Sequence, residues 1–217
     1  MRNSLTRAVL KVGDGRGFVV THRNYLGRRE RVVITAAHCL EHAVLMNGNE
    51  GLPACHPGRG LDEETYPKLL GTLRGAPTVW AACLFVDPIA DIALLGPPDG
   101  QELSGEADAY EEMMEGMATL EVADAPAQGT EVLTFGDRRI ENPTPGQGTA
   151  RVLSLKKRWL EGRVSRRSGW LEFEPGESFA GGMSGSPIVD STGAAIGVVS
   201  TSQSSPVIVD SLSARVV

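Results

Sequence analysis

The sequence predicts an all-β protein built from barrels or a sandwich. Three observations support this: short β-rich runs recur along the chain, turn residues separate them, and aromatic residues are sparse. The 217 residues include 26 glycines and 13 prolines, and only 5% are aromatic. Short strands at this spacing, with Gly and Pro between them, are typical of barrels and sandwiches. A chain of this length can bury a sufficient core without a metal or a disulfide.

The expected strands fall into two sets. The first set comprises residues 8–12, 17–22, 31–35, 43–46, 78–86 and 92–95. The second set comprises residues 131–135, 149–155, 162–164, 170–173, 187–189, 195–200 and 207–209. Within the first set, the segment 47–71 is rich in Gly and Pro, and we expect it to form a long surface loop.

An acidic segment, residues 97–127, lies between the two sets. It begins with GPPDG and continues with GEADAYEEMMEGMA, which contains strong helix formers. This composition predicts a short helix over a mainly solvated connector. We therefore expect an N-terminal lobe over residues 1–105, a connector over 106–128 and a C-terminal lobe over 129–217.

The charge argues against a nucleic acid as partner. The formal net charge is -6 and the pI is about 5.3, whereas phosphate binding requires a positive face. Three short basic clusters, at residues 28–29, 156–158 and 166–167, alternate with apolar residues and are interpreted as solvated strand faces. The sequence also lacks a run of about 20 apolar residues, so we expect no membrane-spanning segment.

The three cysteines, Cys39, Cys55 and Cys83, leave one thiol unpaired under any disulfide scheme. An odd count, together with a start that lacks the apolar run of an export signal, favours a reduced chain in the cytoplasm.

A metal site would draw on the residues that are closest in sequence to such a set: His38, Cys39, His42, Cys55 and His56. Their spacing matches no standard zinc pattern, so we expect neither a metal nor another cofactor.

The first motif that indicates chemistry is VITAAHCL, residues 33–40. A β-branched strand leads into two alanines and then His38. A general base needs a rigid support with open space beside it, and the small alanines leave that space. A histidine in isolation is more often a packed or surface residue, so the motif gains its meaning from its partners.

The second motif is ADIALL, residues 90–95, in which Asp91 precedes an apolar strand. Burying an unpaired carboxylate costs several kcal/mol, so this side chain should have a dedicated partner. A simple turn at the start of the strand is the alternative interpretation. The neighbouring Asp87 competes for the same role, but it precedes Pro88 and lacks the following strand.

The third motif is GGMSGSPIV, residues 181–189. Glycines on both sides of Ser184 permit a sharp backbone path, in which two N–H groups can point into one space and stabilise an oxyanion. A Gly/Ser-rich turn without chemistry is the alternative. Ser186 belongs to the same string.

Together the three motifs resemble the histidine, aspartate and nucleophile motifs of the chymotrypsin/trypsin superfamily of serine proteases. The order His38, Asp91, Ser184 is that of the chymotrypsin arrangement, whereas subtilisin-like and α/β-hydrolase chains use other orders. The resemblance implies two antiparallel six-stranded β-barrels. His38 and Asp91 would lie on the first barrel, Ser184 on the second, and the active site in the cleft between them.

The resemblance also implies a role for each residue. Ser184 would be the nucleophile, His38 the general base, and Asp91 the group that orients His38. The amides of Gly182 and Ser184 would form the oxyanion hole, whereas Ser186 occupies the position of a small structural residue.

The same resemblance implies a substrate site for a protein or peptide. Ser178 would form the floor of the primary pocket, with Phe179 beside it, and the segment Ser200, Thr201 and Ser202 would pair with the substrate backbone as an added strand. Ser200 would also lie beside Asp91. An uncharged floor favours a small or apolar residue at the cleavage site, although a one-residue shift would bring Glu177 into the pocket.

One position departs from the family pattern. Zymogens of this type bury a new N-terminal ammonium against an acid just before the nucleophile, and here that position is Met183. We therefore expect an oxyanion loop that is either preformed or switched by a regulatory domain or partner protein.

Two alternatives to an active endopeptidase remain at this point. One is a catalytically silent binding or sensor module on the same fold, although all three triad residues are present. The other is an esterase, which would share the chemistry but lack a peptide-pairing cleft.

Overall fold

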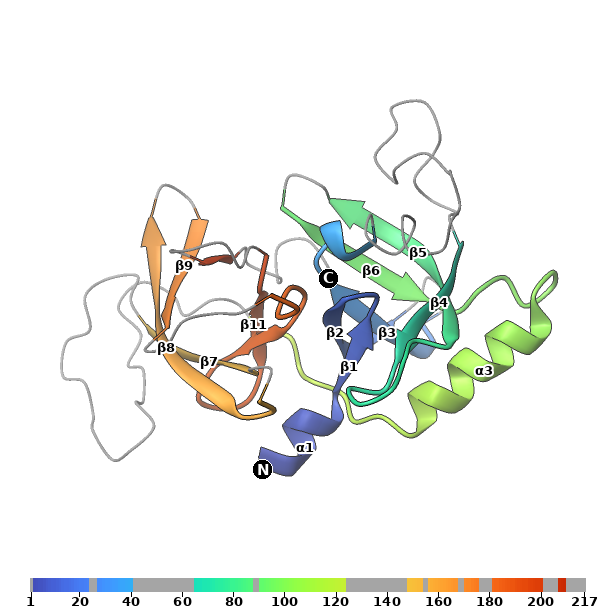
Figure 1. The fold of residues 1–217 in the computed structure, drawn as a ribbon, viewed down its shortest axis with the longest axis horizontal. Coiled ribbons are helices and arrows are strands. Elements are labelled where there is room, and N and C mark those ends of the chain that lie inside the picture. Colours follow the sequence, from blue (N-terminus) through green and yellow to red (C-terminus); the bar gives the residue numbers. More distant parts are fainter. Residues whose placement is uncertain are drawn as a thin grey trace.

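The computed structural model describes residues 2–23, 27–40, 65–87, 90–123, 148–153, 156–167, 170–175, 181–200 and 207–209. Two β-units lie side by side, with the helix α1 (Arg2–Arg7) near their junction and the helix α3 (Ser104–Glu115) on the far side of the first unit (Figure 1). None of the described helices is long and apolar enough to span a bilayer.

The first unit is a closed antiparallel barrel with the strand order β1-β2-β3-β6-β5-β4. Its strands are β1 (Val9–Val12), β2 (Gly15–Arg23), β3 (Arg29–Thr35), β4 (Thr65–Gly71), β5 (Val79–Asp87) and β6 (Ile92–Gly96). Pairing of Lys11 with Gly71 and of Val12 with Leu70 closes the barrel between β1 and β4. The closed six-stranded barrel confirms the expected fold for this half.

The second unit is a six-stranded antiparallel sheet with the order β11-β10-β7-β8-β9-β12. Its strands are β7 (Gly148–Leu153), β8 (Trp159–Arg167), β9 (Trp170–Pro175), β10 (Pro187–Val189), β11 (Ala195–Val198) and β12 (Val207–Val209). The chain is thus mostly β, as expected, with one closed barrel and one further sheet in its described part. The strands expected at 43–46 and 131–135 lie outside the described residues.

One sequence prediction is wrong. Residues 65–71 do not belong to a surface loop but form β4, whose Leu69 and Leu70 are fully buried. The strand is irregular because its register shifts between Tyr66 and Leu70, and Lys68 has a positive φ of 50°. A proline inside a bulged strand removes both the alternation and the composition by which strands are found in sequence.

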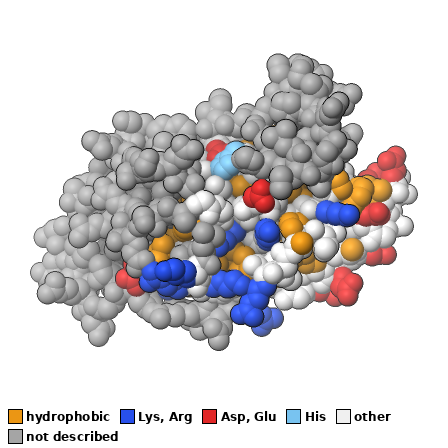
Figure 2. All heavy atoms as spheres, viewed as in Figure 1, with side chains coloured by type: hydrophobic (Ala, Val, Ile, Leu, Met, Phe, Trp, Pro, Cys, Tyr) orange, Lys and Arg blue, Asp and Glu red, His pale blue; other side chains and the backbone are white. Residues whose placement is uncertain are grey.

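The predicted connector helix is present as α3, and most residues of its described segment are exposed or half-buried, as expected, but two of its side chains are in the core. Tyr110 and Met114 are fully buried against the first barrel. The Tyr110 hydroxyl lies 3.1 Å from Arg31 O and 3.2 Å from Leu95 O, so it can donate to either strand. The remaining face of the helix is acidic. In Figure 2 the acidic side chains gather at this end of the molecule, and Lys and Arg side chains lie on the face near α1.

The main hydrophobic core fills the first barrel and continues into the second unit. Leu153, Val189, Ala195 and Val198 from the second sheet belong to the same cluster as the barrel residues. A smaller cluster lies within the second unit and comprises Ala150, Val152, Leu160, Met183, Ile188, Ile196 and Val199. The two units therefore share a continuous apolar junction, which fixes the relation between the residues that each contributes to the site.

Candidate active site

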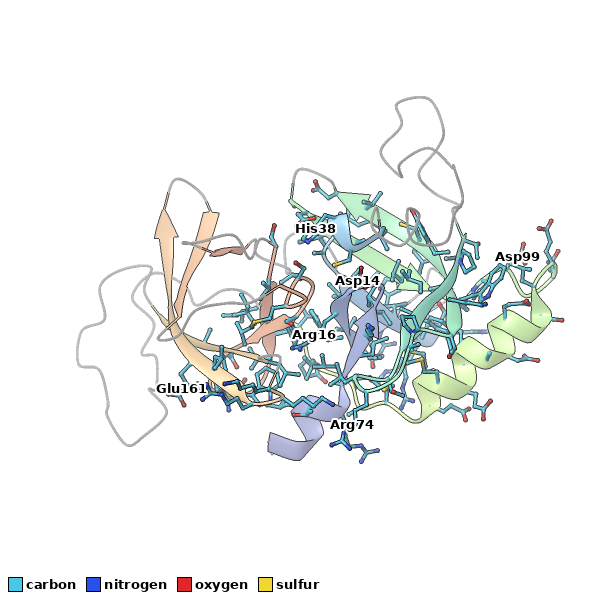
Figure 3. All side chains as sticks on the ribbon, in the orientation of Figure 1. Asp14, Arg16, His38, Arg74, Asp99 and Glu161 are labelled. Atoms are coloured by element: carbon cyan, nitrogen blue, oxygen red, sulfur yellow. The ribbon has the colours of Figure 1, made fainter. Side chains whose placement is uncertain are left out.

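His38 is carried by a short turn directly after β3. Cys39 N–H donates to Ala36 O at 3.0 Å and Leu40 N–H to Ala37 O at 3.0 Å, so the turn is closed by backbone hydrogen bonds. Ala36 and Ala37 are buried, whereas 34% of the His38 side chain is exposed. The barrel thus supplies a rigid support, and the imidazole extends from it toward solvent (Figure 3).

Asp91 lies immediately before β6 in a conformation that few residues adopt. Its φ is 55°, in the left-handed region, which costs free energy for residues other than glycine but is tolerated best by Asp and Asn. The backbone holds this conformation, because Ala37 N–H donates to Asp91 O at 3.1 Å. Backbone strain of this kind is found most often at functional sites.

Two hydrogen bonds join His38 and Asp91. The Nδ1 atom of His38 lies 2.7 Å from Oδ2 of Asp91, and the His38 backbone N–H donates to Oδ1 at 2.9 Å. The carboxylate is only 18% exposed. An Nδ1–H that donates to a carboxylate leaves Nε2 as the acceptor, which is the tautomer that a general base requires.

The competing aspartate has a different partner. Oδ1 of Asp87 accepts the backbone N–H of Ala90 at 2.9 Å and so closes the turn between β5 and β6. Of the two aspartates, it is Asp91 that the structure brings to His38.

Ser200, two residues after the end of β11, adds a third donor to Asp91. Its hydroxyl donates to Oδ2 at 2.6 Å, across the junction between the two units. Ser200 therefore lies beside Asp91, at the place that the sequence resemblance implies for it. A carboxylate that accepts three hydrogen bonds is fixed in orientation, and its negative charge remains compensated in a partly buried place.

The Ser184 loop is a tight turn held from several directions. Gly182 and Gly185 have positive φ angles of 79° and 78°. Ser186 N–H donates to Met183 O at 3.0 Å, and Gly185 N–H donates to Val199 O at 2.8 Å. Ser186 is fully buried, and its hydroxyl has no hydrogen-bond partner among the described residues, whereas Ser184 is partly exposed.

The loop meets the first barrel at β2. Arg16 N–H donates to Ser184 O at 2.8 Å. A Cβ atom added to Gly15 would lie 2.5 Å from the Cys39 sulfur and 2.8 Å from Ser184 O, so the residue after His38 and the Ser184 backbone approach the same point.

Cys39 lies beneath the site and is not a reactive thiol. Burial raises its pKa to about 12, with a smaller contribution from the negative charge of Asp91. The thiolate is the form that attacks electrophiles and binds metals, and the raised pKa keeps its population small at neutral pH. The described part of the chain contains no cluster of three or more potential metal ligands. His42, Cys55 and His56 lie outside it.

Several predicted site residues cannot be compared with the structure. Ser178, Phe179, Thr201 and Ser202 all lie outside the described residues, as does Glu177.

Two residues of this junction, Arg16 and Thr35, were not among the site residues predicted from the sequence. Both are buried, and the Thr35 hydroxyl donates to Arg16 O at 2.6 Å. The signal was present in the string DGRGFVV, where a charged residue stands between two glycines at the start of an apolar strand. A charge in a position that strand periodicity would bury indicates a specific partner.

Comparison with known proteins agrees with this geometry. A family model described as a trypsin-like peptidase domain matches residues 15–198. Two crystal structures of the Rv3671c protease of Mycobacterium tuberculosis, both in an inactive form, have a similar fold. The first, a Ser343Ala mutant, has a TM-score of 0.50 and 14% identity, over 97% of this chain and 83% of that one. The second has a TM-score of 0.51 and 15% identity, over 97% of this chain and 86% of that one. No curated protein matches the sequence significantly.

Proposed function

Since this chain belongs to the trypsin-like peptidase domain family, and is thus a hydrolase of the serine peptidase class, we propose that it is an endopeptidase whose nucleophile is Ser184. His38 is the general base and Asp91 orients it. The observation that carries this proposal is the His38–Asp91 pair, with its 2.7 Å and 2.9 Å contacts, together with a partly exposed serine on a two-glycine turn.

The mechanism follows from these contacts. A serine hydroxyl is a weak nucleophile at neutral pH and needs a base within reach. His38 takes the proton from Ser184 through Nε2 as the oxygen attacks the peptide carbonyl, and then donates it to the leaving amine. Asp91 stabilises the imidazolium that forms in between. Water then attacks the acyl-enzyme by the same route and releases the second product.

The oxyanion of each tetrahedral intermediate is bound by the amides of Gly182 and Ser184 in this proposal. One such donor contributes roughly 3 kcal/mol to transition-state stabilisation. Met183, between them, is 1% exposed and lies in the apolar cluster of the second unit. Its burial supports a loop held in place by apolar packing, in a position where zymogen relatives use an ion pair.

We further propose that the substrate is a protein segment bound along residues 200–202, with Ser178 and Phe179 in the pocket for the residue before the cleaved bond. An uncharged pocket selects a small or apolar side chain. We also propose that a regulatory domain or partner protein controls the site, as in a bacterial signalling or defence module, because Met183 stands where zymogens of this type have the acid used for activation.

The test uses a fluorophosphonate probe, a fluorogenic peptide library and a chromogenic ester on three proteins: the wild type, Ser184→Ala and Ser186→Ala. We expect the wild type to be labelled on Ser184 and to cleave peptides. Loss of the nucleophile should lower kcat by about 10⁶-fold. Ser186→Ala is the matched control, because Ser186 lies two residues after Ser184 in the same loop. The substitution removes a buried hydroxyl that has no hydrogen-bond partner among the described residues.

The outcomes separate the candidate functions. Turnover of esters but not of any peptide would identify an esterase. No labelling and no turnover would identify a silent module and overturn the proposal. Equal loss in both alanine variants would show that the loop, rather than the Ser184 hydroxyl, had been damaged.

A further inference from the structure

Arg16 is a buried arginine at the junction of the two β-units. It lies near the start of β2 and is only 6% exposed (Figure 3). Its guanidinium Nη1 donates to Leu153 O at 2.7 Å, and Leu153 is the last residue of β7 in the second sheet. One side chain of the first barrel thus reaches the backbone of the second unit.

The backbone of the same residue holds the Ser184 loop. Arg16 N–H donates to Ser184 O at 2.8 Å, and Arg16 O accepts the Thr35 hydroxyl at 2.6 Å. The Ser184 loop approaches β2 and β3 closely at Gly185. A Cβ atom added to this glycine would lie 1.8 Å from Arg16 O and 2.5 Å from the Thr35 hydroxyl. Arg16 therefore connects three elements: the end of β3 that leads to His38, the Ser184 loop and the end of β7.

The charge of Arg16 makes this placement costly. Burial lowers the pKa of its guanidinium, which reflects lost hydration of the cation. A guanidinium stays charged in proteins and must be matched by directed acceptors. An apolar side chain would fill the same space without this cost, so what Arg16 adds is a directional bond between β2 and the second sheet.

We propose that Arg16 is a positioning residue, whose guanidinium bond to Leu153 O fixes β2 against the second sheet and so fixes the Ser184 hydroxyl relative to His38. This inference rests on the proposed function, since it takes Ser184 as the nucleophile.

The expected effect is on the chemical step. A shift of about 1 Å between reacting groups can cost about 100-fold in rate. The hydrogen bonds between His38 and Asp91 lie entirely within the first barrel, so the proton-accepting behaviour of His38 should not change. Loss of the Arg16 guanidinium should therefore lower kcat and leave KM and the shape of the pH profile unchanged.

The test compares Arg16→Met, Arg16→Lys and Arg31→Met with the wild type. Arg31 is the matched control, because its guanidinium also donates from a barrel strand to a backbone carbonyl, that of Met114 in α3, away from the second sheet. For each protein we measure Tm, the rate of Ser184 labelling by fluorophosphonate, and kcat and KM on a peptide across pH.

We expect Arg16→Met to lose 10- to 100-fold in kcat and in labelling rate, with KM changed less than twofold. Arg16→Lys, which keeps a cationic donor, should recover part of the rate. Arg31→Met should lower Tm without lowering kcat. If Arg16→Met does not fold, the folded Arg16→Lys variant provides the test instead. A loss of kcat in that variant supports the positioning role.

Equal kcat and labelling rate in the Arg16 variants and Arg31→Met would overturn the positioning role and leave a purely structural one. A wild-type chain that takes no label would instead overturn the proposed function, and this inference with it. The two failures are therefore distinguishable by the wild type alone.

Discussion

The two β-units contribute to the site in different ways. The first barrel holds a complete pair: His38 and Asp91 lie on adjacent strand ends of one closed barrel and share two hydrogen bonds. The second unit contributes Ser184 and Ser200, and both depend on contacts across the junction. Ser184 O accepts the Arg16 amide, and the Ser200 hydroxyl donates to Asp91.

This difference separates two requirements of catalysis. The base and its orienting residue pair within one unit, and the second unit adds one hydrogen bond, from Ser200 to Asp91. The distance from the base to the nucleophile depends on how the two units meet. Changes in the first barrel should therefore alter proton handling, whereas changes at the junction should alter alignment.

The most direct way to break the pair in the first barrel is Asp91→Asn. Asparagine tolerates the φ of 55° and retains an acceptor, so the fold should persist with little change in Tm. The substitution removes the negative charge of Asp91 and the hydrogen bond that selects the tautomer of His38, so kcat should fall by about 10⁴-fold. Peptide turnover and Tm measured on the same preparation check both parts.

The control for this prediction is Asp87→Asn. Asp87 accepts the Ala90 N–H in a turn, whereas the carboxylate of Asp91 accepts both hydrogen bonds from His38. The kcat of Asp87→Asn should stay within about threefold of the wild type. A similar loss in both variants would contradict the assignment of Asp91 as the orienting residue.

A smaller effect is expected from Ser200→Ala, which removes a bond between the units. The hydroxyl donates to a carboxylate at 2.6 Å, and a hydrogen bond to a charged group contributes about 1.5 kcal/mol or more. We expect kcat/KM to fall about tenfold. Ser200→Thr keeps the hydroxyl and should retain most of the activity. If alanine and threonine variants behave alike, the bond to Asp91 has no role in catalysis.

The sequence alone was sufficient to predict the strands that have a regular apolar pattern. The strand before His38 and the strand after Asp91 are regular and apolar, so β3 and β6 lie close to their predicted bounds. The motif residues were found because their types and order are specific. The contact between His38 and Asp91, 53 residues apart, follows from the resemblance to a family and not from any periodicity.

The features that the sequence missed depend on tertiary contacts. β4 contains a proline and a positive-φ lysine, and it is a strand because β1 and β5 pair with it. The buried face of α3 could not be recognised because its apolar residues are few among acidic ones. Arg16 resembles a surface residue in composition, and only the second sheet, more than 130 residues away, makes it a buried one.

The last prediction concerns stability, with no expected effect on the rate at neutral pH, and it probes the interior of the first barrel near the site. The pKa of Cys39 is about 12 in the folded chain because of burial, against an ordinary value of 9.0. Between these values the unfolded chain binds fewer protons than the folded one, so the free energy of unfolding should fall as pH rises above 9. The slope for this one group is at most about 1.4 kcal/mol per pH unit. Burial raises the pKa of Tyr110 as well and adds to the same trend at higher pH.

Urea unfolding of the wild type and Cys39→Ala at pH 8, 9, 10 and 11 isolates the contribution of the thiol, because the tyrosine is common to both. A shallower decline in the variant is expected. Parallel curves would mean that water reaches the sulfur, and that the barrel beneath His38 is less rigid than its closed strands suggest.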